Sequence, residues 1–242
     1  RQTMLFSATM PNEIVHMAHS YMKLPLRIEV APPGTAIEKV TQELFFLSKP
    51  EKPRLLEKLL VEYRGSVLVF SRTKHGAKRI AAHLRSLGHS AAEIHSNRSL
   101  NQRREALDGF RNGKYRILVA TDIAARGIDV KGIELVLNYD LPSNPEDYIH
   151  RIGRTARAGA AGHAVSFATP DQRNDVRDIE RLMRATLSPT SLPQLPPSRE
   201  MAHEPRYYPG PAHNAPRSQG QGHPNSRRPI RRFDRNRFRR RR

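Results

Sequence analysis

The chain has 242 residues, of which 37% are hydrophobic, enough for one domain with a substantial core and a remaining tail. It contains no cysteine, which excludes disulfides and thiolate metal sites, and its apolar runs fall far short of the roughly 20 residues that cross a bilayer. A cytoplasmic protein is therefore expected. The formal net charge of +19 predicts a polyanionic partner, either nucleic acid or an anionic surface.

The predicted elements begin with a helix over residues 11–21, and from residue 27 to 184 short β-branched runs alternate with amphipathic patterns. The clearest strands span residues 66–71, 90–95, 116–121, 134–139 and 163–168. Helices are predicted between strands over residues 52–63, 74–87 and 101–111, the last two followed closely by a glycine that can end a helix. We expect an α/β fold with an open parallel sheet, whose functional residues lie at the carboxyl ends of the strands.

The composition changes at about Leu187 to proline, serine, glutamine, glycine and arginine, with little aliphatic periodicity. Residues 187–242 contain 13 arginines and 3 acidic residues, a net charge of +10, which leaves +9 of the total for the first 186 residues. This basic tail is predicted to be disordered. The chain opens at Arg1 without a methionine or a secretory pattern, and we expect it to be a piece of a longer protein.

The most informative motif is HRIGRTARAG at residues 150–159, in which arginines recur at every third position. On a helix or tight loop, Arg151, Arg154 and Arg157 would share related faces and form a cationic comb for phosphate oxygens. The alternative is a surface helix whose arginines pair with Glu146 and Asp147.

A second motif, ATDIAARGIDV at residues 120–130, follows directly on a buried strand. Its hydroxyl, backbone amides and carboxylate gather at one strand end, where Thr121 can contact a phosphate and Asp129 a sugar hydroxyl. The alternative is a simple capped turn, with Asp122 capping the next helix.

Two further segments, SAT at residues 7–9 and VFSRTK at residues 69–74, carry little information alone, because serine and threonine before a helix are usually caps. Together and in order, however, the four segments resemble motifs III, IV, V and VI of the DEAD-box RNA helicases. The resemblance covers residues 1–186, and its wording is most similar to the bacterial RhlE-type branch.

In that family two RecA-like domains close on ATP and single-stranded RNA. The resemblance implies that residues 1–25 end the N-terminal RecA-like domain and form a linker, that residues 26–186 are the C-terminal RecA-like domain, and that residues 187–242 are the tail. No GxxxxGK[ST] phosphate loop occurs in the sequence. The fragment alone is thus predicted to be inactive, and the Mg²⁺ ligands that accompany ATP are expected in the missing N-terminal domain.

The resemblance also assigns roles to single residues. Arg154 and Arg157 are implied as arginine fingers on the γ-phosphoryl group, and Asp129 as a contact to the ATP ribose. Coupling between hydrolysis and RNA is implied for Ser7, Thr9, His150 and Arg151. The RNA backbone is implied to contact Ser96, Asn97, Arg103, Thr121, Arg126 and Gly127. Such contacts read phosphate and sugar, so little sequence specificity is expected.

Three positions depart from the family pattern. Leu100 stands where glutamine is usual, so one polar contact near Arg103 is expected to be absent. Ser96 replaces a glycine at the closest approach to RNA, and Ala156 replaces a glycine between the two fingers, which we expect to be a mild change.

Two other hypotheses stay open: a stand-alone, non-catalytic RNA-binding or regulatory module, and a DNA helicase of a related superfamily. The tail also has two interpretations. It is either an RNA anchor, whose aromatic residues stack on bases, or a solvated tail without a specific role; these aromatics are Tyr207, Tyr208, Phe233 and Phe238. The eleven histidines form no HxH or HExxH pattern, so no metal site is predicted.

Overall fold

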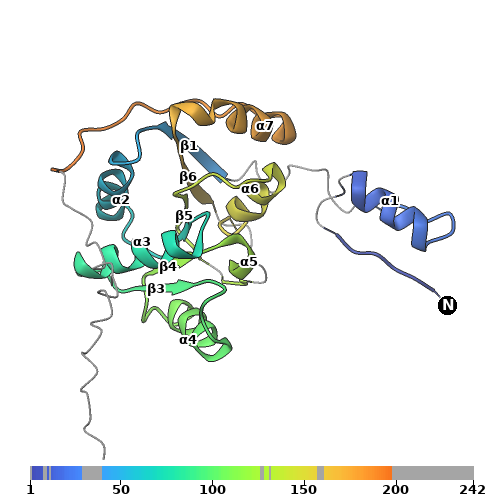
Figure 1. Cartoon of the computed structure of the whole chain (residues 1–242), viewed down its shortest axis with the longest axis horizontal. Coiled ribbons are helices and arrows are strands. Elements are labelled where there is room, and N and C mark those ends of the chain that lie inside the picture. The colour runs from blue at the N-terminus through green and yellow to red at the C-terminus, as the bar shows by residue number, and fades with distance from the viewer. Residues whose placement is uncertain are drawn as a thin grey trace, which may run out of the picture. The chain divides into compact units, whose positions relative to one another are not determined.

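The computed structural model describes residues 2–7, 10, 12–28, 40–125, 128–130, 132–156 and 161–197, and its elements are labelled in Figure 1. The strands are β1 (Val40–Phe46), β2 (Val67–Phe70), β3 (Ala91–Ile94), β4 (Ile117–Ala120), β5 (Leu135–Asn138) and β6 (Gly162–Ala168). The helices are α1 (Asn12–Tyr21), α2 (Glu51–Glu62), α3 (Lys74–Ser86), α4 (Leu100–Arg111), α5 (Asp122–Ala125), α6 (Pro145–Ile152), the short 3-10 helix η2 (Pro170–Gln172) and α7 (Arg173–Met183).

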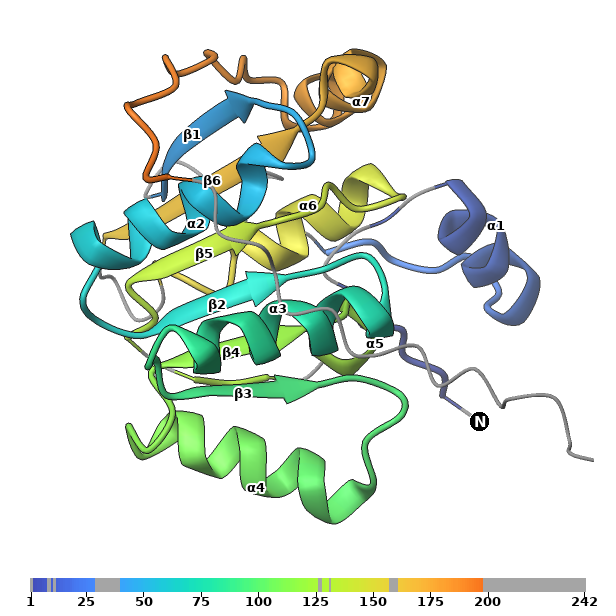
Figure 2. The ribbon, with the colours of Figure 1, turned by 60° about the vertical axis from the view of Figure 1, so that its left-hand side comes forward.

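The six strands form one parallel sheet in the order β1-β6-β5-β2-β4-β3. Alternate residues of a strand face opposite sides, so Val67 and Val69 of β2 pack with α2 and α3, whereas Leu68 and Phe70 pack on the side of α4 and α5. Helices α6 and α7 cover the β1 and β6 end of the sheet through a third apolar cluster. Figure 2 shows the sheet between these helices. Because both faces are buried, the central strands consist almost wholly of apolar residues.

The five strands and the three helices predicted between them are confirmed within one or two residues. Gly88 and Gly113 follow α3 and α4 with φ of 84° and 77°, a left-handed conformation that other residues adopt at a cost. Helix α4 begins with a capping box, in which Ser99 and Gln102 exchange hydrogen bonds between side chain and backbone. These local signals determine where each crossover returns to the sheet.

The predicted start of the tail at residue 187 is wrong for its first segment. Leu187 is buried in the cluster under α7, the Thr190 amide donates to Leu44 of β1, and Arg54 binds the Pro196 carbonyl. Residues 187–197 therefore pack on the domain, although proline prevents them from forming a regular strand. Residues 198–242 lie outside the described residues, so disorder there stays a prediction.

Candidate functional site

The predicted motif residues follow neighbouring strands at one edge of the sheet. Phe70 of β2 pairs with Ala120 of β4 and Asn138 of β5, and Ile94 of β3 also pairs with Ala120, so these four strands end level with one another. The residues that come directly next are Ser71, His95, Thr121 and Tyr139. The expected gathering of polar residues at the carboxyl edge is therefore present.

Arg151 is the centre of this edge, although it comes from α6. Its side chain is 1% exposed and forms a double contact with the Asp122 carboxylate, at 2.5 and 2.8 Å. It also donates to the Asn138 side chain at 3.1 Å and to the Asp140 carbonyl at 2.6 Å, and its guanidinium lies over the Phe70 ring. Arg151 and Asp122, 29 residues apart in the sequence, thus join the two motifs by a partly buried ion pair.

This arrangement corrects two expectations. Arg151 is not a member of a solvent-facing comb with Arg154, because α6 ends at Ile152 and the Arg151 side chain points into the domain. Asp122 lies in the first turn of α5, but both of its carboxylate oxygens bind Arg151, so it is not merely a helix cap.

Asp140, which is partly buried, is a second point of contact between segments, and sequence reasoning missed it. Lys52 of α2 contacts its carboxylate at 3.0 Å, and the Ser71 hydroxyl and the Arg72 amide donate to its other oxygen. Burial raises the pKa of Asp140, but the charge and hydrogen bond of Lys52, together with the hydrogen bonds from Arg72 and Ser71, outweigh it and hold the pKa below the ordinary value of 3.8. The carboxylate fixes the segment after β2 against the segment after β5.

A chain of hydrogen bonds continues from Arg151 through the interior. Asn138 donates to Ser166 of β6 at 3.0 Å, Ser166 donates to the Tyr148 hydroxyl, and Tyr148 donates to Gln42 of β1. Asn138 and Ser166 are completely buried and lose their contacts with water when the protein folds. Their hydrogen bonds compensate for this loss of solvation. The motif on α6 is therefore tied to strands β5, β6 and β1.

Arg154 lies in the turn after α6 and is half-buried. Its guanidinium donates to the Ile128 carbonyl at 2.7 Å and to the His150 carbonyl at 3.2 Å. Ile128 belongs to the predicted ATP and RNA motif, so Arg154 forms a second bridge between the two motifs. These two hydrogen bonds orient the guanidinium.

The same turn makes Ala156 a strained position. Its φ is 54°, in the region that glycine adopts without cost, so the replacement of glycine expected to be mild carries a backbone penalty. Gly162 closes the turn from β6, where an added Cβ would lie 2.5 Å from the Ala156 amide nitrogen.

Arg103 differs from the other candidate residues. It lies in the first turn of α4 and is partly buried, and no acceptor for its guanidinium is present in the described part of the chain. Ser96 and Asn97 are exposed in the preceding turn, where Lys74 binds the Asn97 side chain at 3.0 Å. Leu100 beside them is 60% exposed, an apolar side chain in place of the usual amide.

Some of the remaining candidate residues are described by the structure, and the others are not. Thr121 is half-exposed, and its carbonyl accepts from the amides of α5, whereas Asp129 is exposed and its carbonyl accepts from Arg111. Ser7 is exposed in the segment before α1. The other predicted site residues lie outside the described residues; they are Thr9, Arg126, Gly127 and Arg157.

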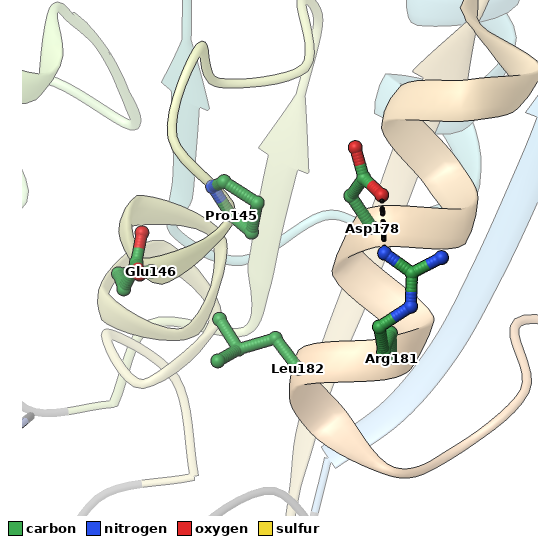
Figure 3. Close-up of a pocket in the computed structure, with 5 residues that line it drawn as sticks. All are labelled: Pro145, Glu146, Asp178, Arg181 and Leu182. Atoms are coloured by element: carbon green, nitrogen blue, oxygen red, sulfur yellow. Dashed lines mark hydrogen bonds and ion pairs between the residues drawn. The ribbon is translucent and has the colours of Figure 1, made fainter. Parts of the chain in front are cut away.

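An open pocket of the described surface lies elsewhere. It is formed between α6 and α7 by Pro145, Glu146, Asp178, Arg181 and Leu182, with Arg181 paired to Asp178 at 2.9 Å (Figure 3). It contains none of the motif residues. The described residues include no cluster of three histidine or carboxylate side chains placed to hold a metal ion, and no described helix is long and apolar enough to cross a membrane.

A doubly wound parallel sheet with linked polar motifs at its carboxyl edge defines an α/β domain of the class that binds phosphate-containing ligands there. Residues 51–159 match the family described as helicase conserved C-terminal domain. The sequence is 42% identical over 189 residues to the ATP-dependent RNA helicase DBP2 of Candida albicans, covering 76% of this chain and 34% of that protein.

Solved structures agree with the sequence comparison. The C-terminal domain of the DEAD-box protein Dbp5 is 31% identical, with 61% of this chain and 86% of that chain covered and a TM-score of 0.55. S. cerevisiae Dbp5 bound to RNA and ADP BeF3 is 29% identical over 76% of this chain and 50% of that chain, with a TM-score of 0.69. The chain belongs to the DEAD-box RNA helicase family, and the described fold is the RecA-like C-terminal helicase domain. It spans about a third of the length of the curated relatives it matches.

Proposed function

We propose that this chain supplies one half of an ATP-dependent RNA helicase: arginine fingers for hydrolysis and one side of a site for the RNA backbone. The observation that carries the proposal is the double linkage of the two motifs, by Arg151 to Asp122 and by Arg154 to the Ile128 carbonyl. Rigid coupling of an ATP contact to an RNA contact is what a helicase needs in order to convert hydrolysis into strand separation.

In this proposal Arg154 and Arg157 approach the γ-phosphoryl group of ATP bound to a second RecA-like domain, the N-terminal domain of the same protein. Positive charge there stabilises the transition state, a contribution of about 10³ to 10⁵ in rate among nucleotide hydrolases. Asp129 accepts a hydrogen bond from the ribose. The Mg²⁺ ligands that accompany ATP are proposed to lie in that N-terminal domain.

The RNA side of the site is proposed to use Arg103 and Thr121, together with Ser96, Asn97, Arg126 and Gly127. Arg103 supports this assignment, because a partly buried guanidinium without an acceptor in the described protein is costly unless a ligand supplies one. Contacts from hydroxyls, amides and a guanidinium bind phosphate and sugar, so the site accepts RNA of any sequence. His150, Ser7 and Thr9 are proposed to help couple closure to hydrolysis.

The proposal is tested by RNA-stimulated ATP hydrolysis, measured for the chain alone and after mixing with an N-terminal DEAD-box core domain. The expected result is no turnover alone and RNA-dependent turnover on mixing, which Arg154→Ala abolishes. Arg104→Ala serves as the matched control, since Arg104 is an exposed arginine of α4 that no motif includes. Turnover by the chain alone would contradict the proposal, as would an unaffected Arg154→Ala variant.

A non-catalytic RNA-binding module is the second candidate, favoured by the 13 arginines beyond residue 197. As an RNA anchor, this segment adds affinity without sequence preference, with a salt slope near −0.7 per phosphate contacted on single strands. Deleting residues 198–242 removes all these arginines and keeps the packed residues 187–197. Unchanged RNA affinity and salt slope would exclude the anchor, whereas RNA binding without turnover on mixing would favour the module over the enzyme. Placement in the bacterial RhlE-type branch is a further proposal, based on motif wording alone.

A further inference from the structure

A buried carboxylate lies beneath the proposed RNA-binding turn. Glu93 is the charged residue of β3, a strand that otherwise consists of alanine and isoleucine, and its side chain is 2% exposed. A carboxylate so far from water is costly unless charged or hydrogen-bonding partners compensate it. Its partners therefore show what the group holds in place.

Two arginines and one histidine surround Glu93. Arg98, in the turn between β3 and α4, donates to one oxygen, and Arg85 of α3 donates to the other at 3.4 Å. His95 Nε2 lies 3.7 Å from Oε1. The side chains of Arg85 and Arg98 are 44% and 34% exposed, so the carboxylate is the buried anchor and the arginines extend from it toward solvent.

His95 holds the backbone of the turn, while its buried Nε2 lies near Glu93 without a hydrogen-bond partner in the described protein. Its Nδ1 accepts a hydrogen bond from the Asn97 amide at 3.3 Å, which requires that Nδ1 carry no proton. Burial lowers the pKa of His95, which keeps the ring neutral and leaves the proton on Nε2, the nitrogen that faces Glu93. The His95 carbonyl meanwhile accepts from the Arg98 amide at 3.0 Å, so both sides of this residue hold the turn.

The turn between β3 and α4 also sets the direction of α4. Ser99 follows Arg98 directly and forms the capping box with Gln102, and the Arg103 amide donates to the Ser99 carbonyl at 2.9 Å. A displaced turn would therefore move Arg103 together with the exposed amides of Ser96 and Asn97.

We propose that Glu93 is a positioning residue for RNA, which fixes the turn at Ser96 and Asn97 and the first turn of α4 without touching the ligand. This inference rests on the proposed RNA function of the same edge. It adds a residue that none of the motifs contains, and it explains why a negative charge is kept beneath a surface that binds a polyanion.

The negative charge of Glu93 makes the proposal easy to test, because electrostatics and positioning predict opposite changes in RNA affinity when that charge is removed. Replacing Glu93 by glutamine removes a negative charge near RNA, so simple electrostatics predicts tighter binding. Loss of positioning predicts weaker binding instead, since glutamine cannot hold Arg98 with the same strength. The direction of the change therefore distinguishes a positioning role from a bystander.

The experiment is RNA-stimulated ATP hydrolysis by the full chain mixed with an N-terminal DEAD-box core domain. Glu93→Gln is expected to raise the KM for RNA about tenfold, equivalent to about 1.4 kcal/mol, with kcat and the KM for ATP unchanged. Glu105→Gln is the control, because Glu105 is an exposed carboxylate of α4 with the same charge and also pairs with a cation, Lys114. It is expected to leave the KM for RNA within about twofold.

Arg98→Gln provides a second variant in case Glu93→Gln destabilises the domain. It is expected to raise the KM for RNA to a similar extent, and the double variant to be no worse than either single one, because both remove the same link. The salt slope should stay unchanged in both variants, whereas Arg103→Ala should lower it by about 0.7 if Arg103 contacts one phosphate.

Tighter RNA binding by Glu93→Gln, or an effect of Glu93→Gln no larger than that of Glu105→Gln, would overturn the proposal. So would additive effects of Glu93→Gln and Arg98→Gln on the KM for RNA. A lowered salt slope for Arg98→Gln would also overturn it, because Arg98 would then be a direct phosphate contact. If the unaltered mixture shows no RNA-stimulated turnover, the proposed function itself is wrong. If it turns over, but neither Arg103→Ala nor Thr121→Ala changes the KM for RNA, the fault lies in the RNA site rather than in Glu93.

Discussion

Arg151 and Arg103 lie at the same edge of the sheet, but they are used in opposite ways. Arg151 is 1% exposed and donates to four oxygens of three residues, whereas Arg103 is partly buried without an acceptor in the described protein. In a chain with 42 lysines and arginines, charge alone cannot separate these roles. Pairing does so, because removing a satisfied buried arginine leaves its partners unpaired at a cost in stability, whereas an unsatisfied one is available to a ligand.

Removing Arg151 tests the structural side of this comparison and carries the largest expected effect. Arg151→Ala leaves the Asp122 carboxylate and the Asn138 amide oxygen without their partner, so the free energy of unfolding should fall by about 3 to 5 kcal/mol. Urea denaturation measures the change. Arg181→Ala is the control, since that arginine pairs with Asp178 on the surface and its loss should cost less than about 1 kcal/mol. Equal losses would contradict the distinction.

Removing Arg103 tests the other side. Arg103→Ala should weaken RNA binding about tenfold, equivalent to about 1.4 kcal/mol, while the free energy of unfolding changes by no more than about 0.5 kcal/mol. Fluorescence anisotropy with single-stranded RNA and urea denaturation provide the two readouts. Arg104→Ala, one residue further along α4, is expected to change neither quantity appreciably. A loss of stability without a loss of RNA binding would assign Arg103 to the framework instead.

Strain in the turn after α6 is a smaller effect that sharpens the same comparison. Ala156→Gly should raise the free energy of unfolding by about 1 kcal/mol, because glycine adopts a φ of 54° without the steric penalty of a Cβ. Ala161→Gly, in the same connection but without a positive φ, should instead be neutral or destabilising. Thermal unfolding of the two variants measures the difference, and stabilisation by both would remove the argument from strain.

The smallest expected effect is a pH dependence from His95. Burial lowers its pKa below 6.5, and Glu93, Arg98 and His75 are the charged or titratable groups around it. The unfolded chain therefore binds a proton more readily than the folded one, so stability is full above pH 6.5 and is lost as the pH falls through the folded pKa. His89, lowered by burial and by Arg116, acts in the same direction. His95→Gln should flatten part of this slope in urea titrations between pH 7 and 5, and an unaltered slope would count against it.

The sequence predicted the central strands and their edge because these features are local. Apolar runs define β2 to β6, and parallel strands bring their carboxyl ends together. The polar nodes could not be predicted, since Lys52 and Asp140 are 88 residues apart and only the sheet order brings them together. The spacing of arginines at every third position also led to a wrong prediction, that Arg151 and Arg154 share related faces. Helix α6 ends at Ile152 and places these two residues in different surroundings. Edge strand β1 was not singled out, because Gln42 and Glu43 interrupt its apolar pattern.

The packed segment after α7 has a consequence for solubility. β1 is hydrogen-bonded to β6 on one side, and on its other side Pro189 bridges Leu44 while the Thr190 amide binds the Leu44 carbonyl. An uncovered edge strand offers its free backbone groups to any other extended chain and so promotes aggregation. A protein cut at residue 186 would expose this strand, whereas one cut at 197 would keep it covered and should remain monodisperse at higher concentration.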